Sequence, residues 1–249
     1  MIVNVSGVQG CDTESKFRRG ERRWLNSGLL ATIVIACIAD AGPATAQPRQ
    51  EQSIVLARQG AFEAGGTVRS DEKGTLSCDH GYVEYQIPVK ARAVSLVMWH
   101  SSAAKVWQNR WDGGEGYQSI FLRRGFPVYL WDGPRVGRGN WGCENYTFKS
   151  ETGRDQQNFV AWRLGAKYLE WFPGVQFPTN DPKAWDQATR ARYDEFDTVK
   201  NAQLETDAAA KAIDQIGPSV LVTNSAGGWR AMLTALKTKS VNIKAIVAY

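Results

Sequence analysis

The stretch LVTNSAGGWRAML, residues 221–233, places one serine between two segments of different pattern. The run 218–222 before the serine starts with proline and is rich in branched apolar residues, which predicts a buried strand. The run 227–238 after it carries apolar residues at helical spacing: Trp229, Met232, Leu233 and Leu236. The sequence therefore predicts that a strand turns into a helix across Ser225.

A strand that turns into a helix across one serine is the frame of a nucleophile elbow, whose usual sequence is G-x-S-x-G. The residues two before and two after the serine must be small, because strand and helix approach closely there. Gly227 meets this demand, and Thr223 meets it less well. Ser225 is therefore a candidate nucleophile, and the alternative is a tight turn without chemistry.

Strands and helices alternate along much of the chain. Three near-continuous apolar runs, 93–100, 127–132 and 243–249, are typical of buried parallel strands. The segments 116–126 and 201–217 have helical spacing and end in or near a glycine, which predicts two helices. This order predicts an α/β protein whose mostly parallel sheet is flanked by helices.

The front of this domain has a different pattern. Residues 53–62 and 81–89 are strand-like, and a polar, glycine-containing stretch at 65–80 separates them. Such a pair suits an antiparallel hairpin at the start of the sheet.

The segment between the first two apolar runs adds a second motif. MWHSSAAKVWQNRWDGGEGYQSIFLRRGFPVYLWDGPRVGRGNWG, residues 98–142, has a His-Ser-Ser turn after a buried strand, then a helix, a second strand ending in Asp132, and a Gly-Arg-Gly loop. In this order and spacing the chain resembles the α/β-hydrolase superfamily, and within it bacterial secreted esterases. It departs from their pattern at His100-Ser101, where His-Gly is common, and at Thr223, where glycine is common.

The resemblance implies an α/β-hydrolase fold and a serine carboxylester hydrolase acting on a small-molecule ester without a cofactor. Ser225 would be the nucleophile, and the backbone amides of Ser102 and Ala226 would form the oxyanion hole. His100 is then expected to shape the loop, and Asp132 to hold the glycine loop in place. His80 is interpreted as a surface histidine.

The rest of the catalytic triad is absent from these residues. In this family an acid and then a histidine follow the serine, and the 249 residues contain neither after Ser225. We therefore expect a fold that is incomplete at its C-terminus, with an unpaired edge on the strand at 243–249, and a chain that is inactive as given. The alternative is a non-catalytic α/β-hydrolase remnant or binding module.

The segment 144–198 lies between the glycine loop and the helix before the elbow. In the family that the chain resembles, an insertion at this place forms a cap over the site. Five aromatic residues would give the cap an apolar underside, or would merely pack it onto the sheet: Trp162, Tyr168, Trp171, Phe172 and Phe177.

Composition argues against several other functions. A net charge of +5 without a basic stripe does not indicate nucleic-acid binding. No C-x-x-C or H-x-x-x-H spacing supports a metal site. The stretch GRGNWG at 137–142 matches a dinucleotide-binding pattern, but no apolar-periodic helix follows it, so we interpret it as a sharp surface loop.

The first 46 residues have the features of an export signal. Four arginines precede the apolar run 29–39, and ATAQ offers a cleavage site after Ala46. This predicts a periplasmic or secreted protein whose folded domain is 47–249. Cys37 could instead carry a lipid, as in lipoproteins. After cleavage, Cys78 and Cys143 remain, either as one disulfide or as two free buried thiols.

Overall fold

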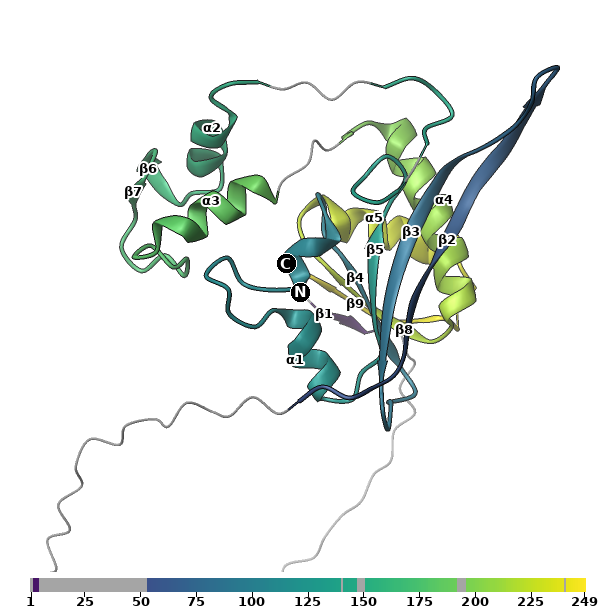
Figure 1. The fold of residues 1–249 in the computed structure, drawn as a ribbon, viewed down its shortest axis with the longest axis horizontal. Helices are drawn as coiled ribbons and strands as arrows, with labels where there is room; N and C mark the ends of the chain where they lie inside the picture. Colours follow the sequence, from purple (N-terminus) through teal and green to yellow (C-terminus); the bar gives the residue numbers. More distant parts are fainter. Residues whose placement is uncertain (1, 5–52, 140, 147–150, 192–195, 240) are drawn as a thin grey trace, which may run out of the picture. The chain divides into compact units, whose positions relative to one another are not determined.

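A seven-stranded mixed sheet is the centre of the protein (Figure 1). The computed structural model describes residues 2–4, 53–139, 141–146, 151–191, 196–239 and 241–249, and these belong to one compact unit. The strand order is β1-β9-β8-β4-β5-β3-β2. In chain order the strands are β1 (Ile2–Asn4), β2 (Leu56–Asp71), β3 (Gly74–Pro88), β4 (Ser95–Trp99), β5 (Val128–Asp132), β8 (Ser219–Thr223) and β9 (Ile243–Ala248).

The central strands are parallel and the outer ones antiparallel. β4 pairs in parallel with β5 and β8, and β8 pairs in parallel with β9. At the edges, β3 pairs antiparallel with β5, β2 with β3, and β1 with β9. The three apolar runs and the strand before Ser225 are thus confirmed as strands of the parallel centre.

Both faces of β4, β5 and β8 are mostly buried, which explains their continuous apolar sequence, whereas β9 is only partly buried. Because successive side chains of a strand point to opposite faces, Val97 and Trp99 pack on one side, whereas Leu96 and Met98 pack on the other. The helices that cover the sheet are η1 (Ala104–Trp107), α1 (Tyr117–Arg123), α4 (Val199–Ile216) and α5 (Ala226–Ala235).

Each face has its own helices. Core residues of α4 and α5, such as Ala208, Ile213 and Ala231, pack with Trp99 on one face. Trp107 of η1 and Leu122 of α1 pack on the other. The sheet is therefore a layer between two groups of helices, as the alternating sequence predicts.

The predicted antiparallel hairpin at the start of the sheet is confirmed, and its two strands extend through the polar stretch at 65–80 that was expected only to separate them. β2 and β3 pair along almost their whole length, out to Asp71 opposite Gly74, and form the long hairpin drawn in blue in Figure 1. The far part of this hairpin is exposed on both faces, so it carries no alternating apolar pattern. Backbone pairing alone makes it a strand, and that pairing leaves no signal in the side chains.

The edge of β9 also differs from the expectation. Residues Ile2, Val3 and Asn4 pair with Val247, Ile246 and Ala245, so β1 covers the edge that was expected to be unpaired. The rest of the predicted export signal, with Cys37, lies outside the described residues. Within the described part of the chain, no helix is long and apolar enough to cross a membrane.

The segment 144–198 folds into a small unit with its own core. It contains α2 (Arg154–Ala161), the short hairpin of β6 (Gly165–Lys167) and β7 (Glu170–Trp171), and α3 (Pro182–Arg190). Phe159, Trp185 and Ala188 are buried at its centre. Tyr168, Trp171 and Phe177 pack against them, whereas Phe172 remains exposed.

Two methionines test the two-faced core. Met98 of β4 is fully buried, so we expect Met98→Ala to lower the free energy of unfolding by about 2–5 kcal/mol because it leaves a cavity. Met232 of α5 is 50% exposed, so Met232→Ala should change the free energy of unfolding by less than about 0.5 kcal/mol. Urea unfolding of both variants measures the difference; similar losses would contradict this packing.

Candidate active site

Ser225 occupies a sharp turn between β8 and α5. Its backbone has φ 52° and ψ −128°, a conformation that is uncommon for a residue with a side chain. The Ser225 N–H donates to the carbonyl of Tyr249 at 3.1 Å, and Tyr249 N–H donates to Thr223 at 3.2 Å, which ties the turn to the end of β9. The Ser225 side chain is exposed to solvent.

The close approach at this turn explains its small residues. A Cβ on Gly227 would lie 2.9 Å from the carbonyl oxygen of Trp99, at the end of β4. Thr223 is accommodated although it is larger, because its fully buried hydroxyl donates to the Val247 carbonyl at 3.1 Å. The form T-N-S-A-G therefore fits the geometry that G-x-S-x-G usually occupies.

The loop after β4 lies beside this turn. The Ser102 N–H, predicted to receive an oxyanion, donates to Nδ1 of His100 at 3.0 Å. The His100 ring also stands edge-on to Trp107, so His100 shapes the loop. Ser102 could therefore contact an oxyanion only by sharing or exchanging its bond to His100, and the roles of Ser102 and Ala226 stay predictions.

Asp132 holds two loops together with one buried carboxylate. Its Oδ1 accepts from the Ala104 N–H at 2.9 Å, and its Oδ2 accepts from Arg138 Nε at 2.8 Å. A Cβ on Gly137 would lie 2.7 Å from this carboxyl group. Asp132 thus holds the loop that contains Gly137, as expected from the sequence, whereas Gly139 packs against Gly133 and Gly142 against Tyr146.

Removing Asp132 should weaken the fold measurably. Asp132→Ala leaves the Ala104 N–H without its acceptor, and we expect the free energy of unfolding to fall by about 2–4 kcal/mol. Glu84 is the other carboxylate paired with Arg138, and it is more exposed, so Glu84→Ala should cost less than about 1 kcal/mol. Urea unfolding compares the two, and an equal cost would contradict the bridging role of Asp132.

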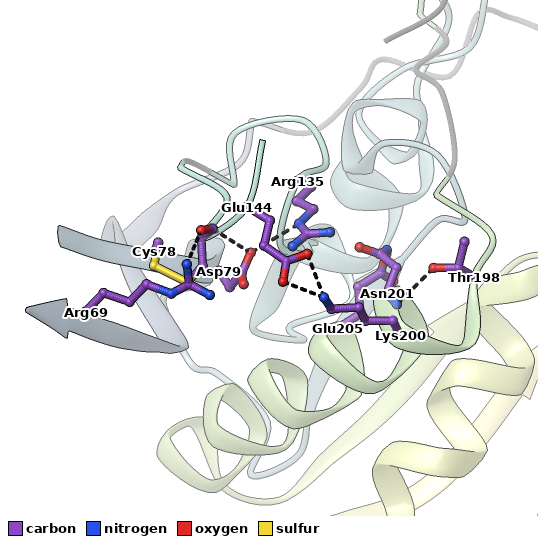
Figure 2. Close-up of polar contacts among 10 residues, drawn as sticks. Arg69, Cys78, Asp79, Arg135, Glu144, Thr198, Lys200, Asn201 and Glu205 are labelled. Carbon is purple, nitrogen blue, oxygen red and sulfur yellow. Dashed lines mark hydrogen bonds and ion pairs between the residues drawn. A yellow bond between two sulfur atoms is a disulfide. The ribbon is translucent and has the colours of Figure 1, made fainter. Parts of the chain in front are cut away.

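The two ends of the 144–198 segment meet at one place (Figure 2). Cys143, just before the segment, forms a disulfide with Cys78 of β3, 65 residues away in the sequence. Glu144 next to it accepts from Lys200 in the first turn of α4, where both oxygens are 2.6 Å from Nζ. Tyr146 and Phe196 also stack edge-to-face across the two ends, with ring centroids 5.1 Å apart.

A buried ion pair supports the disulfide. Asp79, next to Cys78, accepts from Arg135 Nε at 3.1 Å and from the Cys143 N–H at 3.3 Å. On the other side, Arg69 donates to the Cys143 carbonyl at 2.6 Å. Hydrogen bonds from Lys200 hold the pKa of Glu144 below its ordinary value. These contacts lie in one row from the hairpin to α4 in Figure 2.

Of these contacts, the disulfide should contribute most to stability. The Glu144–Lys200 pair is exposed and contributes little on its own, whereas removing a disulfide typically costs about 2–5 kcal/mol. We expect Cys143→Ser to lower the free energy of unfolding by that amount and to increase protease cleavage near residue 146. Dithiothreitol should destabilise the native chain to the same extent and should not affect the Cys78→Ser/Cys143→Ser double variant. If dithiothreitol leaves the stability of the native chain unchanged, the disulfide does not contribute as expected.

A buried ion pair that sequence reasoning missed holds α5 against α4. Arg230 of α5 and Glu205 of α4 are each 1% exposed, and Nη1 lies 3.3 Å from Oε2. Asn201 donates to the other Glu205 oxygen at 2.6 Å. The available signal was that Arg230 shares its helix face with small residues, Gly227 and Thr234, which indicates a buried face rather than a solvated one.

A pocket of about 700 Å³ lies between residues 106–120 and residues 175–178. Tyr117 of its wall contacts Tyr249 with ring centroids 6.4 Å apart, and Tyr249 accepts the hydrogen bond from Ser225. Among the described residues, no group of three His, Cys, Asp or Glu side chains could hold a metal ion.

Comparison with known proteins identifies the fold. No family model and no curated protein matches the sequence. Among solved structures, a bacterial esterase is similar to 77% of this chain and 67% of its own, with a TM-score of 0.66 and 21% sequence identity. The chain therefore has an α/β fold like that of an esterase.

Proposed function

We propose that this chain contributes the nucleophile of a serine carboxylester hydrolase with an α/β-hydrolase fold. The observation that carries the proposal is the conformation of Ser225, a non-glycine residue at φ 52° whose exposed side chain stands between a buried strand and a helix. A backbone of this kind is costly, and such residues cluster at active sites. The esterase-like fold supports the same chemistry.

In this proposal Ser225 Oγ attacks the ester carbonyl carbon. The Oγ proton passes to a base and the carbonyl oxygen becomes an oxyanion. The C–O bond to the alcohol then breaks, the base gives its proton to the departing alcohol, and water later releases the acid from the acyl-serine. The Ala226 amide, at the N-terminus of α5, and the Ser102 amide would stabilise the oxyanion. The residues given after Ser225 contain neither an acid nor a histidine, so this proposal assigns no residue as the base.

We also propose that the 144–198 segment is a cap and that the protein is exported. The segment's own aromatic core and its tied ends fit a unit that covers a site. The Cys78–Cys143 disulfide favours an oxidising compartment, which supports export of the chain.

Fluorophosphonate labelling tests the role of Ser225. Without its base the serine should react about 10²–10⁴-fold more slowly than a serine that has one. Added imidazole should increase labelling because it can act as the base. Ser225→Ala should abolish the imidazole-dependent labelling, whereas Ser77→Ala, at an exposed serine of the hairpin, should not. Mass spectrometry of the labelled peptide locates the adduct.

Two results would contradict the proposal. Absence of Ser225 labelling at any imidazole concentration would favour the alternative, a non-catalytic fold or binding module. Equally fast labelling with and without imidazole would mean that a residue within the chain already serves as the base. His100→Gln would then test the histidine in the loop after β4.

A further inference from the structure

The far half of the β2–β3 hairpin is exposed on both faces. Every residue from 65 to 77 is exposed, although the two strands stay paired as far as Asp71 and Gly74. A two-stranded hairpin on its own is marginally stable at best in water, because it buries too little apolar surface to offset the ordering of its chain. A further strand beside this half would supply the contacts that one copy of the chain lacks.

The outer edge of β2 can accept such a strand. β2 is the last strand of the sheet, and among the described residues it pairs only with β3. Its 16 residues contain neither proline nor lysine, which commonly block an exposed strand edge. The register shift in the hairpin lies between Leu56 and Arg58, at the end far from the turn. The edge is therefore regular from residue 59 to residue 71.

The turn determines which backbone groups point outward from this edge. Asp71 and Gly74 flank a two-residue turn, and residues in that position exchange hydrogen bonds with each other. Hydrogen-bonded positions alternate along an antiparallel pair, so Val68 and Ser70 direct their N–H and C=O groups away from β3. These groups form a template for pairing with another chain.

The charges on β2 match a second copy of β2 that runs antiparallel to it. With Gly66 of both copies on a two-fold axis, residues 61–71 of one copy pair with residues 71–61 of the other. Arg69 then lies opposite Glu63 of the second copy, and the symmetry repeats this pair at the other end. Opposite charges directly across two strands stabilise their pairing. Val68, which is 63% exposed in one copy, would pack against Ala64 of the other.

The hairpin is already held in place before any such pairing. Cys78, which lies opposite Thr67, is joined to Cys143 by the disulfide. Arg69 donates to the Cys143 carbonyl through Nη1 and has further N–H groups for a carboxylate. A segment that is fixed in advance loses less conformational freedom on association, which favours binding.

We propose that two copies of this chain associate through their β2 strands, so that their sheets join into one across a two-fold axis. The contact is antiparallel, extends over residues 61–71 and has one Arg69–Glu63 ion pair at each end. A two-fold dimer is the commonest form of soluble oligomer. The proposal does not depend on the chemistry of Ser225.

Sedimentation equilibrium of charge-reversed variants of the full chain tests the contact. Arg69→Glu and Glu63→Arg each place like charges opposite each other at both ends, so each should raise the dissociation constant of the dimer at least about tenfold. An equimolar mixture of the two variants should dimerise again, because each position then faces an opposite charge. The two positions are about 20 Å apart along one extended strand, so this rescue cannot occur within one copy.

The control is a charge reversal away from the hairpin. Lys183 of α3 is exposed, and Lys183→Glu changes the net charge as much as Arg69→Glu does, so it should leave the dissociation constant unchanged. A native chain that stays monomeric at its highest soluble concentration would overturn the proposal, as would a mixture of the two variants that does not dimerise. A dimer that neither reversal weakens would place the contact elsewhere, for example on the exposed Trp229 and Met232 of α5, and would also overturn it.

Hydrogen exchange adds a measurement at the backbone. The amides of Val68 and Ser70 should exchange several-fold more slowly in the native dimer than in monomeric Glu63→Arg, because they gain acceptors from the second strand. Equal exchange rates in the dimer and the monomer would show that the copies do not meet at this edge.

Discussion

The first turn of α5 lies directly against the end of β4, and this contact governs the geometry of the candidate site. A side chain at Gly227 would come within 2.9 Å of the Trp99 carbonyl, so helix and strand could not approach as they do. At this turn Ser225 has a positive φ of 52°, and its side chain is exposed. Strain at one residue is tolerated because the surrounding sheet and helices over-determine the position of the turn.

A single buried carboxylate extends this arrangement to the neighbouring loops. Asp132 accepts from the Ala104 N–H on one side and from Arg138 on the other, so the loops after two adjacent strands are held at the same edge of the sheet. The Ser225 turn follows β8, which is the other neighbour of β4. Three loops therefore converge where the parallel strands end, which is where ligands bind in open α/β sheets.

A second group of contacts holds the 144–198 segment at its base, and one of them, Asp79–Arg135, involves the loop after β5. The disulfide, the Asp79–Arg135 pair and the Glu144–Lys200 pair differ in exposure, and the covalent bond is the strongest of them. Because both ends of the segment are joined there, its aromatic core can keep Phe177 close to the pocket that Tyr117 also lines. Stability at the base and the shape of the pocket are thus linked through one segment.

Local sequence pattern was sufficient for the parallel strands, the helices around them and the turn at Ser225, because each of these depends on neighbours along the chain. Residues 221–233 alone predicted strand, serine and helix. The exposed half of the hairpin had no such pattern, since only backbone pairing with the partner strand makes it regular. Three features depend on which distant segments become neighbours: the Glu205–Arg230 pair, the Cys78–Cys143 bond, and the pocket between residues 106–120 and 175–178. Their partners are far apart in the sequence, so the packing of the sheet and helices had to bring them together.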